Sequence, residues 1–262
     1  METKKLTTIQ IQAKGPVVSV TLFRPDRLNA LDVTMIGELI ETLRQANSDP
    51  SVRVIILTGD GERSFCSGAD LTQEQLGKPG EYEQHLREYY HPLLRAITGS
   101  PKPFIASLNG AVVGAGIGLA LACDYIIAVP EVQFHMAFAR IGLVPDTGVM
   151  SFVTNHIGRQ RAFDWAATAG AMSAQEALKN GMINEIVERE NLVMSSRTKA
   201  AVYAKMPKAA LGFIKQMSHA AVNHTLDEML VIERNLQERA AAEPDHMEGV
   251  RAFLEKRNPE FS

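Results

Sequence analysis

The amino-acid sequence predicts an α/β fold in which strands alternate with helices and then give way to helices alone. Short β-branched runs such as RVIILTGDG (53–61) end at glycine, which is typical of buried strands. Segments with apolar residues three and four positions apart separate these runs, as in amphipathic helices. After about residue 192 only the helical spacing remains. We therefore expect a core over residues 1–192 and a helical region over residues 193–262.

The chain begins with a predicted β-hairpin, which is followed by a capped helix. Residues 7–23 alternate apolar and polar residues, break at Gly15-Pro16 and alternate again. Asp32 ends the turn RPDRLNALD (24–32) and can cap the first turn of a helix. That helix carries its apolar residues on one face: Met35, Leu39 and Leu43.

The rest of the chain continues the alternation before the helical region. In that region, Thr225 with Glu228 predicts a capping box, and Asp245 with Glu248 predicts the aspartate version of it. Gly181 is expected to end the last helix of the core. In chain order we expect a strand at 53–61, the turn FCSGADL at 65–71, a polar loop at 73–80, a helix at 82–98, a strand at 101–110, a helix at 119–123, a strand at 125–129, a short strand with a turn at 132–148, a helix at 173–179 and a strand at 183–188.

Composition and charge restrict the partners of the chain. Its 262 residues have a net charge of −3 and no basic block, so nucleic acid is not an expected partner. The longest apolar stretch, 104–129, contains Asn109 and Asp124, which make a membrane span costly. The N-terminus lacks the apolar segment of a secretory signal. Cys66 and Cys123 fit free thiols in a reducing compartment, so we expect a cytoplasmic protein. No His, Cys and Asp cluster has the spacing of metal ligands, so no metal or permanently bound cofactor is expected.

The stretch NGAVVGAGIGLALACD (109–124) is unusually rich in glycine and alanine. A dinucleotide fingerprint would need a third glycine where Leu119 stands, and a P-loop would need a lysine that the stretch lacks. What remains is a helix whose first turn is glycine and alanine, which leaves backbone N–H groups open to a ligand atom. The alternative is that small residues simply let this helix pack tightly, and the stretch alone does not decide between the two.

A second small-residue turn favours the ligand interpretation. SFCSGAD (64–70) also follows a strand-like region and can offer the amide of Ala69. Two such turns could direct two N–H groups at one oxygen. A thioester carbonyl that becomes an enolate needs two donors of this kind.

Four motifs follow one another along the chain: RPDRLNALD, RSFCSGADL, PKPFIASLNGAVVGAGIGLALACDYIIA and FARIGLVPDTG. These motifs and their order resemble the crotonase (enoyl-CoA hydratase/isomerase) superfamily. The resemblance runs from about residue 8 to the C-terminal helix GVRAFLEKRNPEF. It implies a ββα spiral core, a C-terminal helical trimerisation region, assembly as a homotrimer or a dimer of trimers, and a coenzyme A thioester as substrate.

The resemblance also implies an oxyanion hole and a catalytic acid. The oxyanion amides would belong to Ala69, after Gly68, and Ala115, after Gly114. Asp146 in GLVPDTG matches the acid of the ring-enoyl-CoA isomerases of phenylacetate breakdown, which this sequence resembles most. It would remove an α- or γ-proton and return it at the other end of the allylic system. Taken by itself, the sequence P-D-T-G indicates a turn.

The positions of the two hydratase glutamates hold Gly118 and Phe138, which argues against ordinary water addition. Three alternatives nevertheless stay open: an enoyl-CoA hydratase, a non-catalytic CoA-binding subunit, and an aromatic acyl-CoA dehalogenase or hydrolase. In the dehalogenase type, Asp146 would be the nucleophile and His91 its partner, although Tyr90 and Phe138 replace the flanking tryptophans.

The resemblance further implies contacts with the CoA portion and the acyl group of the substrate. Arg24 and Arg257 are alternative cations for the CoA phosphates. Candidates for the lining of an aromatic or alicyclic acyl pocket are Tyr89, Tyr90, Met136 and Phe138, and a place in the core is the equal alternative for each of them. The expected CoA contacts are Arg27, Ala30, Ser67, Asp70, Leu71 and Lys256.

Overall fold

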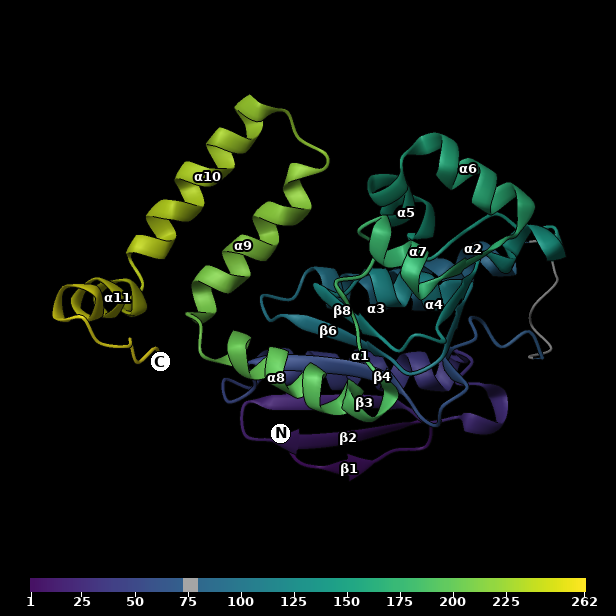
Figure 1. Cartoon of the computed structure of the whole chain (residues 1–262), viewed down its shortest axis with the longest axis horizontal. Coiled ribbons are helices and arrows are strands. Elements are labelled where there is room, and N and C mark those ends of the chain that lie inside the picture. The colour runs from purple at the N-terminus through teal and green to yellow at the C-terminus, as the bar shows by residue number, and fades with distance from the viewer. Residues whose placement is uncertain (73–79) are drawn as a thin grey trace.

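The computed structural model describes residues 1–72 and 80–262, and in it the core contains two sheets (Figure 1). The polar loop predicted at 73–80 falls, except for Gly80, outside the described residues. The larger sheet has the order β1 (Lys4–Lys5), β2 (Ile9–Lys14), β3 (Val17–Leu22), β4 (Val54–Gly59), β6 (Phe104–Leu108), β8 (Tyr125–Ala128) and β11 (Glu185–Ile186). The smaller sheet has the order β10 (Ala171–Ser173), β9 (Gln133–His135), β7 (Ala111–Val113) and β5 (Ser64–Cys66).

The larger sheet is antiparallel at the hairpin and parallel from β3 to β11. Its central strands β4 and β6 are almost completely buried, as the continuous apolar runs predict. In the smaller sheet, β5, β7 and β9 are parallel, and β10 closes the edge in the antiparallel direction. Each of the small-residue turns identified in the sequence follows a strand of this smaller sheet, β5 and β7 respectively.

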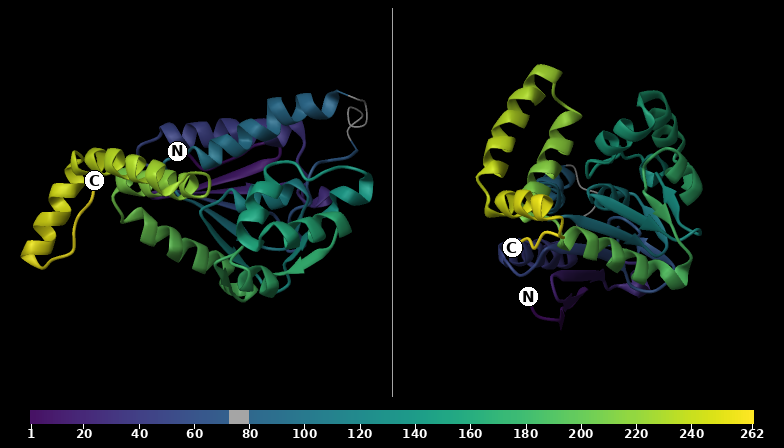
Figure 2. Two further views of the ribbon diagram at one scale, coloured as in Figure 1. Left: turned by 90° about the horizontal axis from the view of Figure 1, so that it is seen from above. Right: turned by 60° about the vertical axis from the view of Figure 1, so that its left-hand side comes forward.

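Helices cover both faces of the larger sheet. α1 and α3 lie on one face, and α8 packs along β3, β4, β6 and β8 on the other (Figure 2). α9, α10 and α11 extend away from the sheets (Figure 1). The helical segments are η1 (Pro25–Arg27), α1 (Val33–Ser48), α2 (Glu81–His85), the π-helix η2 (Leu86–Tyr90), α3 (His91–Thr98), α4 (Ala115–Leu121), η3 (Ala137–Ile141), α5 (Val149–Ile157), α6 (Arg159–Thr168), α7 (Ala174–Lys179), η4 (Arg189–Asn191), α8 (Leu192–Ala204), α9 (Lys208–Ala221), α10 (Leu226–Ala241) and α11 (Pro244–Glu255).

Two predicted caps are confirmed. The Asp32 carboxylate accepts a hydrogen bond of 2.7 Å from the amide of Met35 and starts α1. Thr225 and Glu228 form a reciprocal capping box at the start of α10. Both helices therefore begin where the sequence indicates.

Two other predictions are wrong in detail. The helix predicted at 119–123 begins at Ala115, because Gly114 has a φ of +54° and turns the chain immediately before it. Asp245 does not cap α11, whose N-cap is Glu243. Its carboxylate instead accepts hydrogen bonds from the amide and hydroxyl of Ser262, and Glu248 pairs with Arg257.

α5 and α6 have no counterpart among the predicted elements. Among the described residues, no helix is both long and apolar enough to cross a membrane.

Candidate active site

A pocket of about 310 Å³ lies where the two small-residue turns, the helical segment α2–η2, and η3 meet. Its surface is largely apolar, and Asp146 contributes the carboxylate among the described residues that line it. The lining residues are Ser67, Gly68, Ala69, Leu71, Tyr82, His85, Leu86, Tyr90, Val113, Gly114, Ala115, Ala137, Phe138, Arg140, Ile141, Leu143 and Asp146.

The amide of Ala69 is left open by the way its turn pairs with Leu31. The Leu31 amide donates to the Gly68 carbonyl at 2.7 Å, and the Asp70 amide donates to the Leu31 carbonyl at 2.9 Å. This bridge uses the groups on either side of the Ala69 N–H, which therefore faces away from Leu31. Within the described part of the chain, the Ala69 N–H donates no hydrogen bond.

The second turn lies directly against the first. A Cβ added to Gly68, whose φ is +90°, would come within 2.9 Å of the Val113 carbonyl oxygen and 3.4 Å of the Ala115 nitrogen. Ala115 begins α4, so its N–H has no partner within the helix, and it donates no hydrogen bond to any residue that the structure describes. Two open N–H groups thus line the same pocket, at Ala69 and Ala115.

The glycines of α4 also serve close packing, so the two interpretations of this stretch apply to different positions. A Cβ at Gly116 would lie 2.6 Å from the Cys66 carbonyl oxygen. At Gly118 it would lie 2.1 Å from the carbonyl oxygen of Thr147, a distance at which atoms overlap. Gly116 and Gly118 therefore admit neighbouring backbone, whereas Gly114 and Ala115 face the pocket.

Asp146 sits in a tight turn at the edge of the pocket. The Val149 amide donates to the Asp146 carbonyl at 2.9 Å, and the Thr147 hydroxyl donates to Asp146 Oδ1 at 2.7 Å. Burial raises the pKa of the Asp146 carboxyl above its ordinary value of 3.8, while the Thr147 hydrogen bond and the charge of His91 act in the opposite direction. A buried carboxyl with a raised pKa is a suitable proton acceptor and donor.

The two positions that would hold hydratase glutamates carry no acid. Gly118 leaves no space for a side chain because the Thr147 carbonyl fills it. Phe138 lines the pocket, and its ring lies 3.8 Å from the place of a Cβ at Gly114.

Aromatic and apolar side chains form the rest of the pocket. Tyr90 lines it and is only 9% exposed, and burial together with the charge of Asp146 raises the pKa of its phenol. Tyr89 does not line the pocket but packs edge-on against His85, and Met136 is completely buried in the core. His91 is exposed and outside the lining.

Tyr82 and Leu86 are two of the eight lining residues that do not appear among the sequence candidates. Together with Tyr90 they are spaced four residues apart along one helical segment, and this spacing was the signal that could have identified them. The π-helical turn at Leu86–Tyr90 falls within the same segment, and such turns are frequent at functional sites.

The candidate CoA contacts are divided between the pocket and other parts of the molecule. Ser67 and Leu71 line the pocket, but the Ser67 amide is bound to the Leu28 carbonyl. The Arg24 guanidinium pairs with the Asp70 carboxylate at 2.8 Å and donates a hydrogen bond to the Ala30 carbonyl at 2.7 Å.

The other candidate cations differ in their surroundings. Arg27 is exposed, and its carbonyl accepts from the Ser67 hydroxyl and the Ala30 amide. Lys256 follows α11, which lies at the opposite end of the molecule from α2 (Figure 1), and Arg257 pairs with Glu248. Within one chain, the structure therefore does not bring Lys256 or Arg257 to the pocket.

Neither cysteine has the properties of a nucleophile. Both thiols are free and buried, and burial raises the pKa of Cys66 to about 12. No group of three or more potential metal ligands occurs in the regions 1–72 and 80–262.

Comparison with known proteins identifies the fold first. A solved structure from Geobacillus kaustophilus HTA426, described as enoyl-CoA hydrates subunit I, gives a TM-score of 0.93 at 34% sequence identity and covers 99% of both chains. An enoyl-CoA hydratase from Bacillus anthracis gives a TM-score of 0.91 at 30% identity, covering 97% of this chain and 99% of its own. The protein therefore has the crotonase-like α/β fold, which confirms the predicted fold class.

The sequence comparisons then identify the family. The family model described as enoyl-CoA hydratase/isomerase matches residues 12–262. The 1,2-epoxyphenylacetyl-CoA isomerase of Escherichia coli (strain K12) is 39% identical over 94% of this chain and 95% of its own length. A Rhodobacter capsulatus protein named "Probable enoyl-CoA hydratase" is 40% identical over 97% of this chain and 98% of its own. This chain belongs to the enoyl-CoA hydratase/isomerase family, whose members act on CoA thioesters.

Proposed function

We propose that this protein is an acyl-CoA isomerase that shifts a carbon–carbon double bond by proton transfer. The observation that carries the proposal is the arrangement of acids in the pocket. Asp146 is the one carboxylate among the described lining residues, while Thr147 fills the space beside Gly118 and a phenyl ring stands at Phe138. An isomerase needs one carboxylate, because the carboxyl that forms when it removes a proton can then return a proton.

The geometry supports a two-step reaction. The thioester carbonyl oxygen is held by the N–H groups of Ala69 and Ala115, which begin unpaired and need no rearrangement. Asp146 takes a proton from the allylic carbon, and the electron pair of that C–H bond moves into the enolate. The Asp146 carboxyl exchanges its proton with solvent, and the enolate then takes a proton from it at the other end of the allylic system, so the double bond has moved and the enzyme is unchanged.

The lining of the pocket favours an apolar, ring-bearing acyl group. Tyr82, Leu86, Tyr90 and Phe138 provide aromatic and aliphatic surface on several sides. The E. coli relative is named as an isomerase of 1,2-epoxyphenylacetyl-CoA. We therefore place the enzyme in the catabolism of aromatic acids, with fatty acids as the alternative source of its thioesters.

Two other reactions have one supporting observation each. Several relatives carry the name of a hydratase, which supports water addition. The charge of His91 acts on Asp146, which supports a hydrolytic or dehalogenating reaction, although His91 itself lies outside the pocket lining. A non-catalytic CoA-binding subunit would not require a buried acid at Asp146.

A panel of CoA thioesters separates these functions. We expect conversion of β,γ-unsaturated linear and ring-bearing thioesters to their α,β isomers, followed by proton NMR, and slow hydration of crotonyl-CoA. Rapid hydration of crotonyl-CoA would favour the hydratase. Release of free CoA would favour the hydrolase, and binding without any turnover would favour the non-catalytic subunit.

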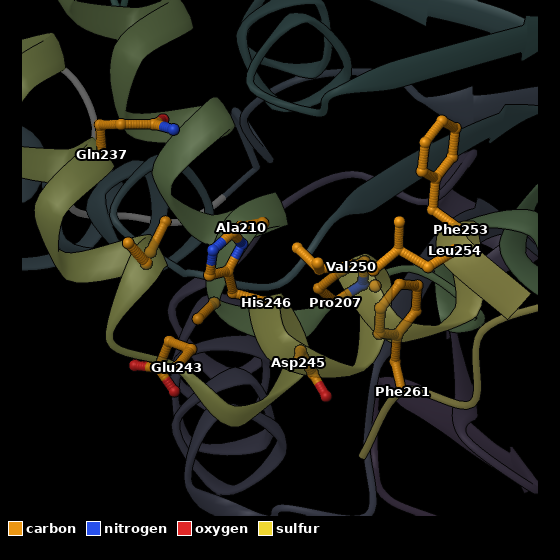
Figure 3. Close-up of a pocket in the computed structure, with 14 residues that line it drawn as sticks. Pro207, Ala210, Gln237, Glu243, Asp245, His246, Val250, Phe253, Leu254 and Phe261 are labelled. Atoms are coloured by element: carbon orange, nitrogen blue, oxygen red, sulfur yellow. The ribbon is translucent and has the colours of Figure 1, made fainter.

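We also propose that the chain assembles as a homotrimer or a dimer of trimers through α9–α11. Large apolar side chains on these helices face outward, with Phe253 81% exposed and Leu226 73% exposed. A hollow of about 490 Å³ lies among the same helices, and Figure 3 shows Val250, Phe253 and Phe261 gathered at one side of it. Exposed apolar surface on this scale is typical of a subunit interface.

Light scattering after size-exclusion chromatography tests the assembly. The wild type is expected to elute at three or six times the chain mass, and Phe253→Glu is expected to shift it to smaller species. A wild-type monomer would contradict the assembly without affecting the chemistry of the pocket.

The two free, buried thiols support a cytoplasmic location for the enzyme.

A further inference from the structure

Thr147 adopts a backbone conformation that its residue type disfavours. It has a φ of +50°, and Gly148 after it has a φ of +69°. The Val149 amide closes the turn on the Asp146 carbonyl at 2.9 Å. Two consecutive positive φ values define a turn that glycine, asparagine and aspartate normally occupy. A β-branched residue there is an outlier that its surroundings must hold in place.

The surroundings of Thr147 do hold it. The residue is 2% exposed, and its carbonyl oxygen lies 2.1 Å from where a Cβ would stand on Gly118. Its Cγ2 atom lies 3.0 Å from the same point. Because Gly118 has no side chain, it leaves the space that Thr147 occupies. Because Gly118 belongs to α4, the helix that presents the Ala115 amide also fixes the turn that carries Asp146.

The Thr147 hydroxyl uses this conformation to reach its neighbour. It donates to Asp146 Oδ1 at 2.7 Å, although the two residues are adjacent in sequence. In a helix or a strand, consecutive side chains point in different directions and do not meet in this way. The left-handed turn is thus what brings the hydroxyl and the carboxylate together.

We propose that Thr147 is a positioning residue, whose hydroxyl holds Oδ1 of Asp146 and leaves Oδ2 as the oxygen that exchanges protons with the substrate. The inference rests on the proposed isomerase function and deepens it. Glycine or asparagine would suit the backbone better than threonine, so the turn alone does not account for this residue. The hydroxyl accounts for it, because neither of those residues could supply one.

Three substitutions separate positioning from a purely structural role. Thr147→Val keeps the branched shape and the strain but loses the donor. Thr147→Gly relieves the strain and also loses the donor. Thr147→Ser keeps the donor. Thr58→Val is the matched control, because the Thr58 hydroxyl makes a 2.8 Å hydrogen bond to the Ser107 carbonyl in the sheet.

The probe is hex-3-enoyl-CoA, and the readouts are kcat, KM, the pH profile of kcat/KM and the melting temperature. We expect Thr147→Val and Thr147→Gly to lower kcat at least about tenfold with little change in KM. Loss of a donor to the carboxylate raises its pKa, so the acid limb of kcat/KM is expected to move up by about one pH unit. Among the described residues, the other titratable or charged groups that line the pocket are Tyr82, His85, Tyr90 and Arg140, and His91 acts on Asp146 through its charge. None of these groups is altered.

Thr147→Ser is expected to recover most of the turnover and to return the acid limb of the kcat/KM profile to its wild-type position. Thr58→Val is expected to leave that limb unchanged. Thr147→Gly should melt no lower than the wild type even though its turnover falls. If Thr147→Val and Thr147→Gly keep the wild-type kcat and pH profile, the inference is overturned. It is also overturned if turnover only follows the melting temperature. Should Asp146→Asn keep full turnover in the same assay, the proposed function fails instead.

Discussion

The turns Gly68–Ala69 and Gly114–Ala115 contribute backbone N–H groups to the candidate pocket, whereas the turn at Asp146 contributes a side chain. The backbone groups are oriented by a strand bridge and by the start of α4, so substitution of a side chain does not delete them. The carboxylate depends on one residue in a strained turn. Under the proposed function, the fold supplies the anion site, while the position of a single acid selects the reaction.

Removing the acid is expected to have the largest effect on turnover. Asp146→Asn keeps the size of the side chain and an acceptor for Thr147 but cannot take a proton. We expect kcat to fall about a thousandfold with KM for a β,γ-enoyl-CoA nearly unchanged, measured by steady-state kinetics. A comparable rise in KM would instead assign Asp146 to binding.

Crowding the backbone side of the pocket is expected to come next. Gly68→Ala places a methyl group 2.9 Å from the Val113 carbonyl oxygen at a φ of +90°, so the two turns must separate. We expect a loss of about 2–3 kcal/mol in the free energy of unfolding, measured with urea, and a drop in turnover of at least about tenfold.

Gly15→Ala is the control for that substitution. Gly15 also has a positive φ, +58°, but a Cβ there meets nothing within 4 Å. We expect it to lose only about 1 kcal/mol of stability and to keep full turnover. Equal losses of turnover in the two variants would show that separation of the turns is not the cause.

The burial of Asp146 predicts a pH-dependent stability difference of smaller size. Its pKa is raised in the folded state, so the folded chain binds this proton more tightly than the unfolded chain. Protonation of Asp146 therefore contributes to the free energy of unfolding below the ordinary pKa of 3.8, and this contribution is lost as the pH rises through the folded-state pKa. At neutral pH we expect Asp146→Asn to melt at a higher temperature than the wild type, with the difference shrinking in acid. A difference that is constant with pH would exclude this cause.

His91 is expected to contribute least. It is exposed and outside the pocket lining, and its effect on the pKa of Asp146 is smaller than those of burial and of the Thr147 hydrogen bond. Solvent and salt screen a charge in such an exposed position. We expect His91→Gln to change kcat for the isomerisation by no more than about twofold. Loss of all turnover would favour the hydrolytic alternative, in which His91 activates water.

Much of the fold follows from the sequence because its signals are local. The strand at 53–61 and the Asp32 cap depend on apolar runs and on one side chain near its own backbone. The cap predicted at Asp245 does not form, because the carboxylate accepts a hydrogen bond from the amide of Ser262 instead. Local patterns contain no information about partners so far apart in the chain.

The candidate site divides in the same way. The family resemblance predicts Asp146 and Ala115, the small-residue turn predicts Ala69, and the structure brings all three to one pocket. The role of Gly118 could not be deduced from the sequence. The space that a side chain would need there is occupied by the carbonyl of Thr147, a residue 29 positions later. Likewise, no spacing rule shows that Thr147 adopts a positive φ, since threonine is not a residue that the rule would expect there.

Isotope exchange tests the role of Asp146 most directly. Wild-type enzyme incubated with hex-3-enoyl-CoA in deuterated water is expected to incorporate deuterium at both the α and γ carbons, followed by NMR. Asp146→Asn is expected to bind the same thioester and incorporate essentially none. Exchange at the wild-type rate in Asp146→Asn would contradict the assignment of proton transfer to this carboxylate.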